Sequence, residues 1–291
     1  MARELWKCEH QTDLWTVCGG LHREDGRRET HEELYGVTQS HIIAYRDLLK
    51  ALGMSNTSIT NRLSALSSLY KHLAEKQLCP SNPVSGVRYP HKGTNVLGSG
   101  KTPTLIPRQV RAMLDAPDTS TLQGLRDRAI LHVFFYTGGR CSEPGSLKVK
   151  DFRMDREYWV LEMTIKGEKI NTIAIHTECQ IAIHKYLQEA GHGDDPYSPL
   201  FRAVMIGKNT GGPLTRLQFY RLFKKYVRLA GLPSSVTPHS ARATFITKAY
   251  EAGIQGEDIQ RTVGHSSITT TEGYNHTARR HRKSASFGVN Y

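Results

Sequence analysis

Residues 237–276 constrain the fold of this chain more than any other segment, because capping residues and glycines divide them into short helices. A threonine followed by Pro238 opens the segment, and this pair suits the N-cap and the first position of a helix. A second helix is predicted over residues 256–263 and should stop at Gly264. The serines after this glycine can cap a third helical turn, which carries Tyr274. The segment is therefore predicted to form three short helices joined by tight turns.

The ends of these helices carry side chains that suit a phosphate. His239 and Arg242 lie three residues apart and should share one face at the positive end of the first helix. Free N–H groups at that end and a planar guanidinium both bind anionic oxygens. The hydroxyl of Tyr274 has an ordinary pKa of about 10, so it needs nearby cations or a base to act as a nucleophile at neutral pH. Together with His265, on the corner before the third turn, these residues indicate a site that handles a phosphodiester.

The order and spacing of these residues resemble the active-site signature of the tyrosine site-specific recombinases, also called phage-type integrases. The matching elements are His239-x-x-Arg242, the run GHSS at 264–267, and Tyr274, which follows His265 by nine residues. One short motif can arise by chance, but three in register form a specific signal.

Upstream, the resemblance adds an arginine and a lysine. The stretch TGGRCSEPGSLKVKDF resembles the first-arginine motif of the family and matches Arg140 to the catalytic arginine. Ser142 is predicted to cap a short helix here, with Glu143 favouring its start. The stretch IKGEKINTIAI aligns Lys166 with the catalytic lysine of a β-hairpin, with Lys169 as the alternative. The resemblance thus implies six catalytic residues: Arg140, Lys166, His239, Arg242, His265 and Tyr274.

The resemblance also implies the reaction. Tyr274 would attack the scissile phosphorus to give a 3′-phosphotyrosine and a free 5′-hydroxyl, while the two arginines stabilise the nonbridging oxygens. His239 would act as base or acid at the tyrosine, Lys166 would protonate the 5′-oxygen, and His265 would donate to a nonbridging oxygen. Neither metal nor ATP nor another cofactor is expected, and the run GSGK at 98–101 lacks the glycine spacing of a P-loop.

Two other functions stay open. The same catalytic set with one active protomer would make a type IB topoisomerase, which the short helical N-terminal region and the nine-residue spacing disfavour. A DNA-binding regulator that has lost the chemistry is disfavoured because all six catalytic positions hold competent residues.

Charge and composition agree with a nucleic-acid partner. The formal net charge is +12, and residues 104–291 carry +9 of it. Such a basic surface favours polyanions through counterion release, so double-stranded DNA is the expected partner. No apolar run approaches the roughly 20 residues that span a bilayer, and the N-terminus lacks a signal-peptide core. A cytoplasmic, nucleoid-associated location is therefore expected.

The five cysteines are scattered, as is typical of reduced thiols rather than a disulfide framework. Cys8, His10, Cys18 and His22 form a loose group whose spacing matches no common zinc module. No metal site is predicted.

Hydrophobic periodicity and composition divide the chain into two domains. Residues 1–30 are expected to form an N-terminal arm, and residues 31–90 a helical DNA-binding (core-binding) domain. Residues 91–104 combine Pro, Gly, Ser and cations like an exposed linker. Residues 105–291 should form the catalytic domain with a basic C-terminal tail. By resemblance, the two domains would close as a clamp around DNA in a homotetramer, a dimer at each site, that passes through a Holliday junction.

The fold class expected is mainly α with a small antiparallel β-hairpin. Helices are predicted from Thr38 and near Ser58, and then over residues 107–114, 121–136, 178–189 and 215–230, with strands near 158–164 and 170–175. The last of these helices carries a row of cations that forms either a solvated face or a phosphate contact: Arg216, Arg221, Lys224, Lys225 and Arg228. In the resembled family the C-terminal segment often docks on the neighbouring protomer; a frayed terminus is the alternative here.

Overall fold

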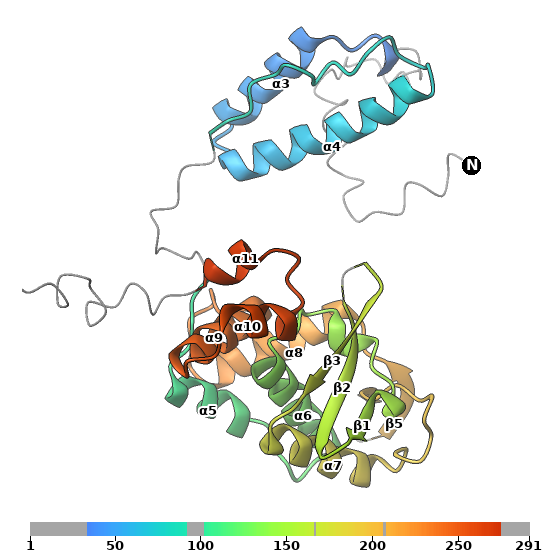
Figure 1. Cartoon of the computed structure of the whole chain (residues 1–291), viewed down its shortest axis with the longest axis vertical. Coiled ribbons are helices and arrows are strands. Elements are labelled where there is room, and N and C mark those ends of the chain that lie inside the picture. Colours follow the sequence, from blue (N-terminus) through green and yellow to red (C-terminus); the bar gives the residue numbers. More distant parts are fainter. Residues whose placement is uncertain (1–33, 92–101, 166, 206–207, 275–291) are drawn as a thin grey trace, which may run out of the picture. The chain divides into compact units, whose positions relative to one another are not determined.

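The computed structural model describes residues 34–91, 102–165, 167–205 and 208–274. The expected N-terminal arm, the Cys and His group near the N-terminus, most of the linker, Lys166 and the C-terminal tail lie outside these ranges. The chain forms two compact units, residues 1–94 and 95–291 (Figure 1).

The first unit is built on two helices, α3 (Gln39–Ala51) and α4 (Asn56–Glu75). Apolar residues spaced by three and four along each helix, such as Leu49, Ile59 and Leu63, are buried in one shared cluster. Burial of each such side chain stabilises the unit by about 1.5–3 kcal/mol. The α4 helix begins slightly before the predicted start near Ser58, because Ser55 is its N-cap and the Ser55 hydroxyl accepts a hydrogen bond from the backbone N–H of Ser58 at 3.2 Å.

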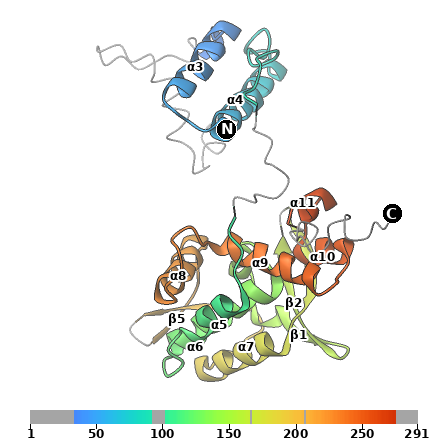
Figure 2. The same ribbon diagram turned by 90° about the vertical axis from the view of Figure 1, so that its left-hand side faces the viewer.

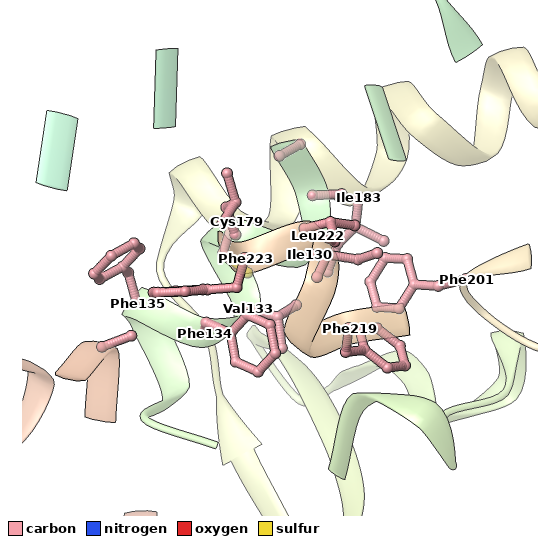
Figure 3. Packing of buried hydrophobic residues seen from close by; sticks show 14 of the residues in the cluster. Ile130, Val133, Phe134, Phe135, Cys179, Ile183, Phe201, Phe219, Leu222 and Phe223 are labelled. Carbon is pink, nitrogen blue, oxygen red and sulfur yellow. The ribbon is translucent and has the colours of Figure 1, made fainter. Parts of the chain in front are cut away.

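The second unit is mainly helical around one central helix, α6 (Leu122–Thr137). Apolar side chains cover α6 on nearly all sides, so it is buried rather than amphipathic. Its Phe134 meets Phe219 and Phe223 of α8 (Arg216–Leu229) edge to face, with ring centroids 6.3 and 5.7 Å apart (Figure 3). The other helices around this core are α5 (Pro107–Asp115), α7 (Thr177–Ala190) and α9 (Pro238–Glu251).

A buried charge ties α6 to α8. Asp127 accepts hydrogen bonds from Arg126 at 2.6 Å and from the Tyr226 hydroxyl at 2.9 Å. Arg126 also donates to the carbonyl of Arg202 in β4 at 3.1 Å. A buried carboxylate with several donors is satisfied, so this network fixes how the central helix sits among its neighbours.

Two antiparallel sheets flank the helices. The first has the order β1–β2–β3, from β1 (Phe152–Asp155), β2 (Tyr158–Ile165) and β3 (Lys169–Ala174). The pairing of Ile165 with Lys169 closes the predicted hairpin. The second pairs β4 (Arg202–Met205) with β5 (Lys208–Pro213), which sequence analysis did not predict because KNTGGP lacks alternating apolar residues. The mainly helical fold with a small antiparallel sheet is confirmed.

The C-terminal helices lie together beside the first sheet. α9 leads into α10 (Gly256–Val263) and α11 (Ile268–Glu272), and α10 lies next to both of the other helices (Figures 1 and 2). The bounds of α10 are those predicted. Within the described ranges, no helix is long and apolar enough to cross a membrane.

Candidate active site

Three chain segments bring five of the six predicted catalytic residues together. Arg140 follows the end of α6, and His239 and Arg242 lie on the first turns of α9. His265 occupies the turn between α10 and α11, and Tyr274 follows α11. Residues separated by more than a hundred positions in the sequence therefore share one site.

The phenol of Tyr274 sits between the two histidines. Its Oη lies 2.7 Å from Nε2 of His239, within hydrogen-bond distance. The ring of His265 stacks on the tyrosine ring, with centroids 6.1 Å apart and planes 12° from parallel. Thr247 of α9 donates to the backbone carbonyl of Tyr274 at 3.3 Å. The sequence did not show whether His265 and Tyr274 meet, and the structure places them in contact.

Electrostatics favour a protonated tyrosine beside neutral histidines in the free protein. Burial lowers the pKa of His239 and the positive charges of Arg242 and Arg140 lower it further. Burial raises the pKa of Tyr274, and the two arginines partly oppose that increase. A neutral His239 Nε2 facing a protonated phenol is the arrangement of a general base.

Arg242 is buried deeper than its predicted role suggested. Its side chain is 1% exposed and donates from Nη1 to the carbonyl of Gly138 and from Nη2 to that of Val263, both at 2.7 Å. These carbonyls end α6 and α10, so the guanidinium joins three helices. Burial, and then the charge of Arg140, lowers the pKa of Arg242 to about 10, which still leaves it charged at neutral pH. A guanidinium has five N–H donors, so others remain for a phosphate.

Arg140 is held by a carboxylate that sequence analysis assigned differently. Glu143, 5% exposed, accepts from the backbone N–H of Arg140 at 2.6 Å and from its Nη1 at 2.8 Å. Arg140 Nη2 also donates to the carbonyl of Gly264 at 3.3 Å. Ser142 makes no capping hydrogen bond, and the predicted short helix is the 3₁₀ turn η1 (Glu143–Gly145). Ser142 therefore holds the predicted N-cap position but does not cap through its side chain, and Glu143 orients Arg140 in addition to lying at the start of the turn.

His265 is fixed through both its backbone and its ring. Gln260 accepts from the backbone N–H of His265 at 3.1 Å through its carbonyl and donates to the His265 carbonyl at 3.0 Å through its amide. Nδ1 of the ring lies 2.9 Å from Oγ1 of Thr271. Burial, followed by the charges of Arg242 and Arg140, lowers the pKa of His265 to about 4. Gln260 and Thr271 were missed by sequence analysis; their only signal was a position five or six residues from His265.

Thr237, predicted to cap α9, contacts the first turn of the helix through its backbone N–H and not through its side chain. The backbone N–H of Thr237 donates to the hydroxyl of Ser240 at 3.1 Å, and the Thr237 side chain makes no capping hydrogen bond. Thr237 still occupies the N-cap position, and Pro238 opens the helix as predicted.

The β2–β3 hairpin, on which the catalytic lysine was predicted, packs against the end of α10. A Cβ built at Gly264 would lie 2.7 Å from Cδ1 of Ile165, the last residue of β2. Gly264 has a φ of +65°, so glycine suits both its conformation and this close approach. On β3, Asn171 donates to the carbonyl of Thr262 in α10 at 2.9 Å. The exposed Lys169 pairs across the hairpin with Ile165, while its competitor Lys166 lies outside the described residues.

The cations of α8 divide into two kinds. Lys224 donates to the carbonyls of Ser234 and Val236, and Lys225 pairs with Asp127 at 3.7 Å. The three arginines of the helix, by contrast, are exposed, and the helix contains no carboxylate. The lysines therefore serve the fold, and the arginines form the surface available to a polyanion: Arg216, Arg221 and Arg228.

Comparison with known proteins gives concordant matches. The model of the phage integrase family matches residues 103–281. The tyrosine recombinase XerD of Lacticaseibacillus casei is 29% identical, over 94% of this chain and 87% of the relative. XerD of Xanthomonas axonopodis pv. citri is 31% identical over 85% and 81%, respectively. The crystal structure of a lambda integrase dimer (residues 75–356) bound to a COC′ core site matches with a TM-score of 0.66 and 17% identity, over 96% of this chain and 93% of that one, and so shares the fold.

Proposed function

Because this chain belongs to the phage integrase family and is a tyrosine recombinase, we propose that it cuts and rejoins DNA at specific sites through a covalent bond to Tyr274. The observation that carries this proposal is the contact of 2.7 Å between the Tyr274 hydroxyl and His239, with two arginines beside it. A phenol, a neutral base and fixed cations together suit attack on a phosphodiester.

The cleavage step follows from this geometry. Tyr274 Oη forms a bond to phosphorus while its proton passes to Nε2 of His239, and the bond from phosphorus to the 5′-oxygen breaks. The products are a 3′-phosphotyrosine and a 5′-hydroxyl. Lys166 supplies the proton to the departing oxygen, and Lys169, the first residue of β3, is the alternative donor. The covalent bond conserves the phosphodiester energy, so a 5′-hydroxyl from another duplex reverses the step without ATP.

The two arginines stabilise the charge that grows on the nonbridging oxygens. Arg140 keeps its orientation through Glu143, and Arg242 through two helix-end carbonyls, so both cations are in place before DNA binds. Groups that are already fixed need no reorganisation in the transition state, and each preorganised donor accelerates such reactions by about 10²–10³-fold. His265 contributes a third, neutral donor.

The remaining parts of the chain complete the expected assembly. The helical first unit would grip DNA, with the exposed arginines of α8 contacting phosphates from the catalytic unit. A dimer on each of two sites would form the working tetramer, held by the C-terminal tails and passing through a Holliday junction. The protein would act on DNA in the cytoplasm, as part of the nucleoid.

Neither alternative function is favoured. A silent regulator would not need the tyrosine, its base and both arginines to converge, as they do here. A type IB topoisomerase would share the chemistry but relax supercoils as a single active protomer, which a relaxation assay distinguishes from strand exchange between two sites.

The deciding experiment traps the covalent intermediate. A duplex site is first selected from a random-sequence pool by binding to the protein, and a nicked suicide version of it is then incubated with the protein in EDTA. We expect an SDS-stable adduct from the wild type and none from Tyr274→Phe. Tyr250→Phe is a matched control, because the Tyr250 hydroxyl is buried without a hydrogen-bond partner among the described residues. Adduct from Tyr274→Phe, or none from the wild type on a site that it binds, would contradict the proposal.

A modified substrate separates the two lysines. Replacing the bridging 5′-oxygen by sulfur gives a leaving group that departs as a thiolate and needs no proton, since a thiol has a pKa of about 8.5. Lys166→Ala should cleave the ordinary substrate slowly and recover on the sulfur substrate, whereas Lys169→Ala should resemble the wild type on both. The reverse result would assign the acid to Lys169.

A further inference from the structure

The hydroxyl of Thr271 is buried beside a catalytic histidine. Thr271 lies on α11, its side chain is 0% exposed, and its Oγ1 lies 2.9 Å from Nδ1 of His265. Among the described residues, this nitrogen is the one hydrogen-bond partner of the hydroxyl. Within the same ranges, the Nε2 of His265 has no protein partner, so it is available to a ligand.

Counting donors selects the direction of this hydrogen bond. His265 is neutral at physiological pH because burial and the neighbouring arginines disfavour its charged form, so the ring carries one N–H. If that proton were on Nδ1, Thr271 would accept it and the buried threonine proton would have no acceptor, which is costly. If Thr271 donates to Nδ1, both groups are satisfied and the ring proton is on Nε2.

We propose that Thr271 is a positioning residue that holds His265 in the tautomer protonated at Nε2, so that this nitrogen donates to a nonbridging oxygen of the scissile phosphate. The part that concerns the phosphate rests on the proposed function, whereas the tautomer itself does not.

The placement of Thr271 couples this donor to the nucleophile. Thr271 precedes Tyr274 by three residues, and the backbone N–H of Tyr274 donates to the Thr271 carbonyl at 3.0 Å. A displacement of α11 that removes the tyrosine from the site would therefore also release Nδ1 of His265. α11 thus carries the residue that sets the tautomer of His265, and the nucleophile follows two residues after the helix ends.

The tautomer is measurable on the full chain without DNA. Long-range ¹H–¹⁵N correlation spectra of protein labelled at histidine nitrogen distinguish the protonated from the unprotonated ring nitrogen. Comparison with His265→Gln identifies the His265 signals among the 14 histidines. We expect Nε2 to be protonated and Nδ1 unprotonated in the wild type. A wild-type His265 protonated at Nδ1 would overturn the proposal whatever any variant does.

Three variants link the tautomer to the reaction. Thr271→Val removes the hydroxyl at nearly constant volume and should give a mixture of tautomers, with suicide-substrate cleavage slower by about 10- to 100-fold. Thr271→Ser keeps the hydroxyl and should restore both measurements. Thr270→Val makes the same change at an exposed neighbour in α11 and should leave both as in the wild type.

The two proposals fail in different ways. Loss of cleavage in Thr271→Val with the tautomer unchanged would show that the threonine only supports the fold. Normal cleavage with a mixture of tautomers would show that the reaction does not depend on the tautomer of His265. Absence of any wild-type adduct would instead contradict the proposed function, while the spectra of the free protein would still decide the tautomer.

Discussion

Replacing Glu143 by alanine tests whether the orientation of Arg140 depends on this carboxylate. Breaking a buried ion pair costs about 3–5 kcal/mol. The Arg140 side chain is 34% exposed and Glu143 is 5% exposed, so water replaces part of the lost interaction, and we expect about 2–3 kcal/mol of destabilisation. For a unit of this size, that lowers the melting temperature by about 4–12 °C.

The effect on the reaction should exceed the effect on folding. Once Glu143 is gone, the Arg140 backbone N–H and guanidinium lose two short hydrogen bonds, of 2.6 and 2.8 Å. The arginine then no longer occupies one fixed position, and we expect single-turnover cleavage to slow by about 100-fold at a temperature where the variant is folded. Glu143→Gln keeps an acceptor of the same shape, so its cleavage rate should lie between those of the wild type and Glu143→Ala.

A surface pair provides the control. Arg153 and Glu162 form an ion pair of 3.1 Å with side chains 44% and 31% exposed. Glu162→Ala should change stability by less than about 1 kcal/mol and leave cleavage unaltered. If Glu143→Ala melts and cleaves like Glu162→Ala, then Glu143 does not hold Arg140 in position.

Three further predictions concern the site and its support. Gly264→Ala should lower both the melting temperature and the rate of cleavage, because the added methyl group meets Ile165 at 2.7 Å and the φ of +65° disfavours alanine. Gly253 also has a positive φ, of +85°, but an added methyl group there meets no atom within 4 Å, so Gly253→Ala measures the backbone strain alone in the same assays. The stability that His265 contributes should be fully present above about pH 6.5 and fall toward pH 4. The pKa of His265 is lowered to about 4 in the folded protein, so between these pH values the unfolded chain binds a proton at this histidine that the folded protein does not. Thermal melts from pH 4.5 to 7.5 should show this fall, and an equal fall in His265→Gln would contradict the assignment to His265. Leu63→Ala, at a fully buried position of α4, should destabilise the first unit by about 2–5 kcal/mol in denaturant unfolding, and a change below 1 kcal/mol would show that this core does not stabilise the unit.

Local signals explain why the helices of the catalytic unit could be predicted. The bounds of α10 follow from Gly264, which adopts the left-handed conformation that ends a helix. Pro238 marks the start of α9 in the same way. Strands β4 and β5 carry no comparable signal, since a short polar segment with two glycines is typical of a loop until it pairs with its neighbour.

The sequence predicted which side chains meet in the candidate site, but it did not predict the contacts that hold them. Arg242 binds the carbonyls of Gly138 and Val263, and a backbone carbonyl has the same chemistry whatever residue bears it. Thr271 and Gln260 act through groups that are common on helix surfaces, so nothing in their sequence context separates them from solvated residues. Such contacts become visible only when distant segments are placed in space.

The carbonyls that hold Arg242 also bear on how such a protein could change over evolutionary time. A mutation of Tyr274 removes the proposed nucleophile, yet the backbone contacts at this position with Thr247 and Thr271 remain possible with another side chain. A mutation of Arg242 removes the two hydrogen bonds that it donates to the carbonyls of Gly138 and Val263, and with them a polar link from α9 to the ends of α6 and α10. Descendants that abandon recombination but still bind DNA should therefore have lost the tyrosine first and retained this arginine, as a relic of catalysis preserved by selection for a folded domain.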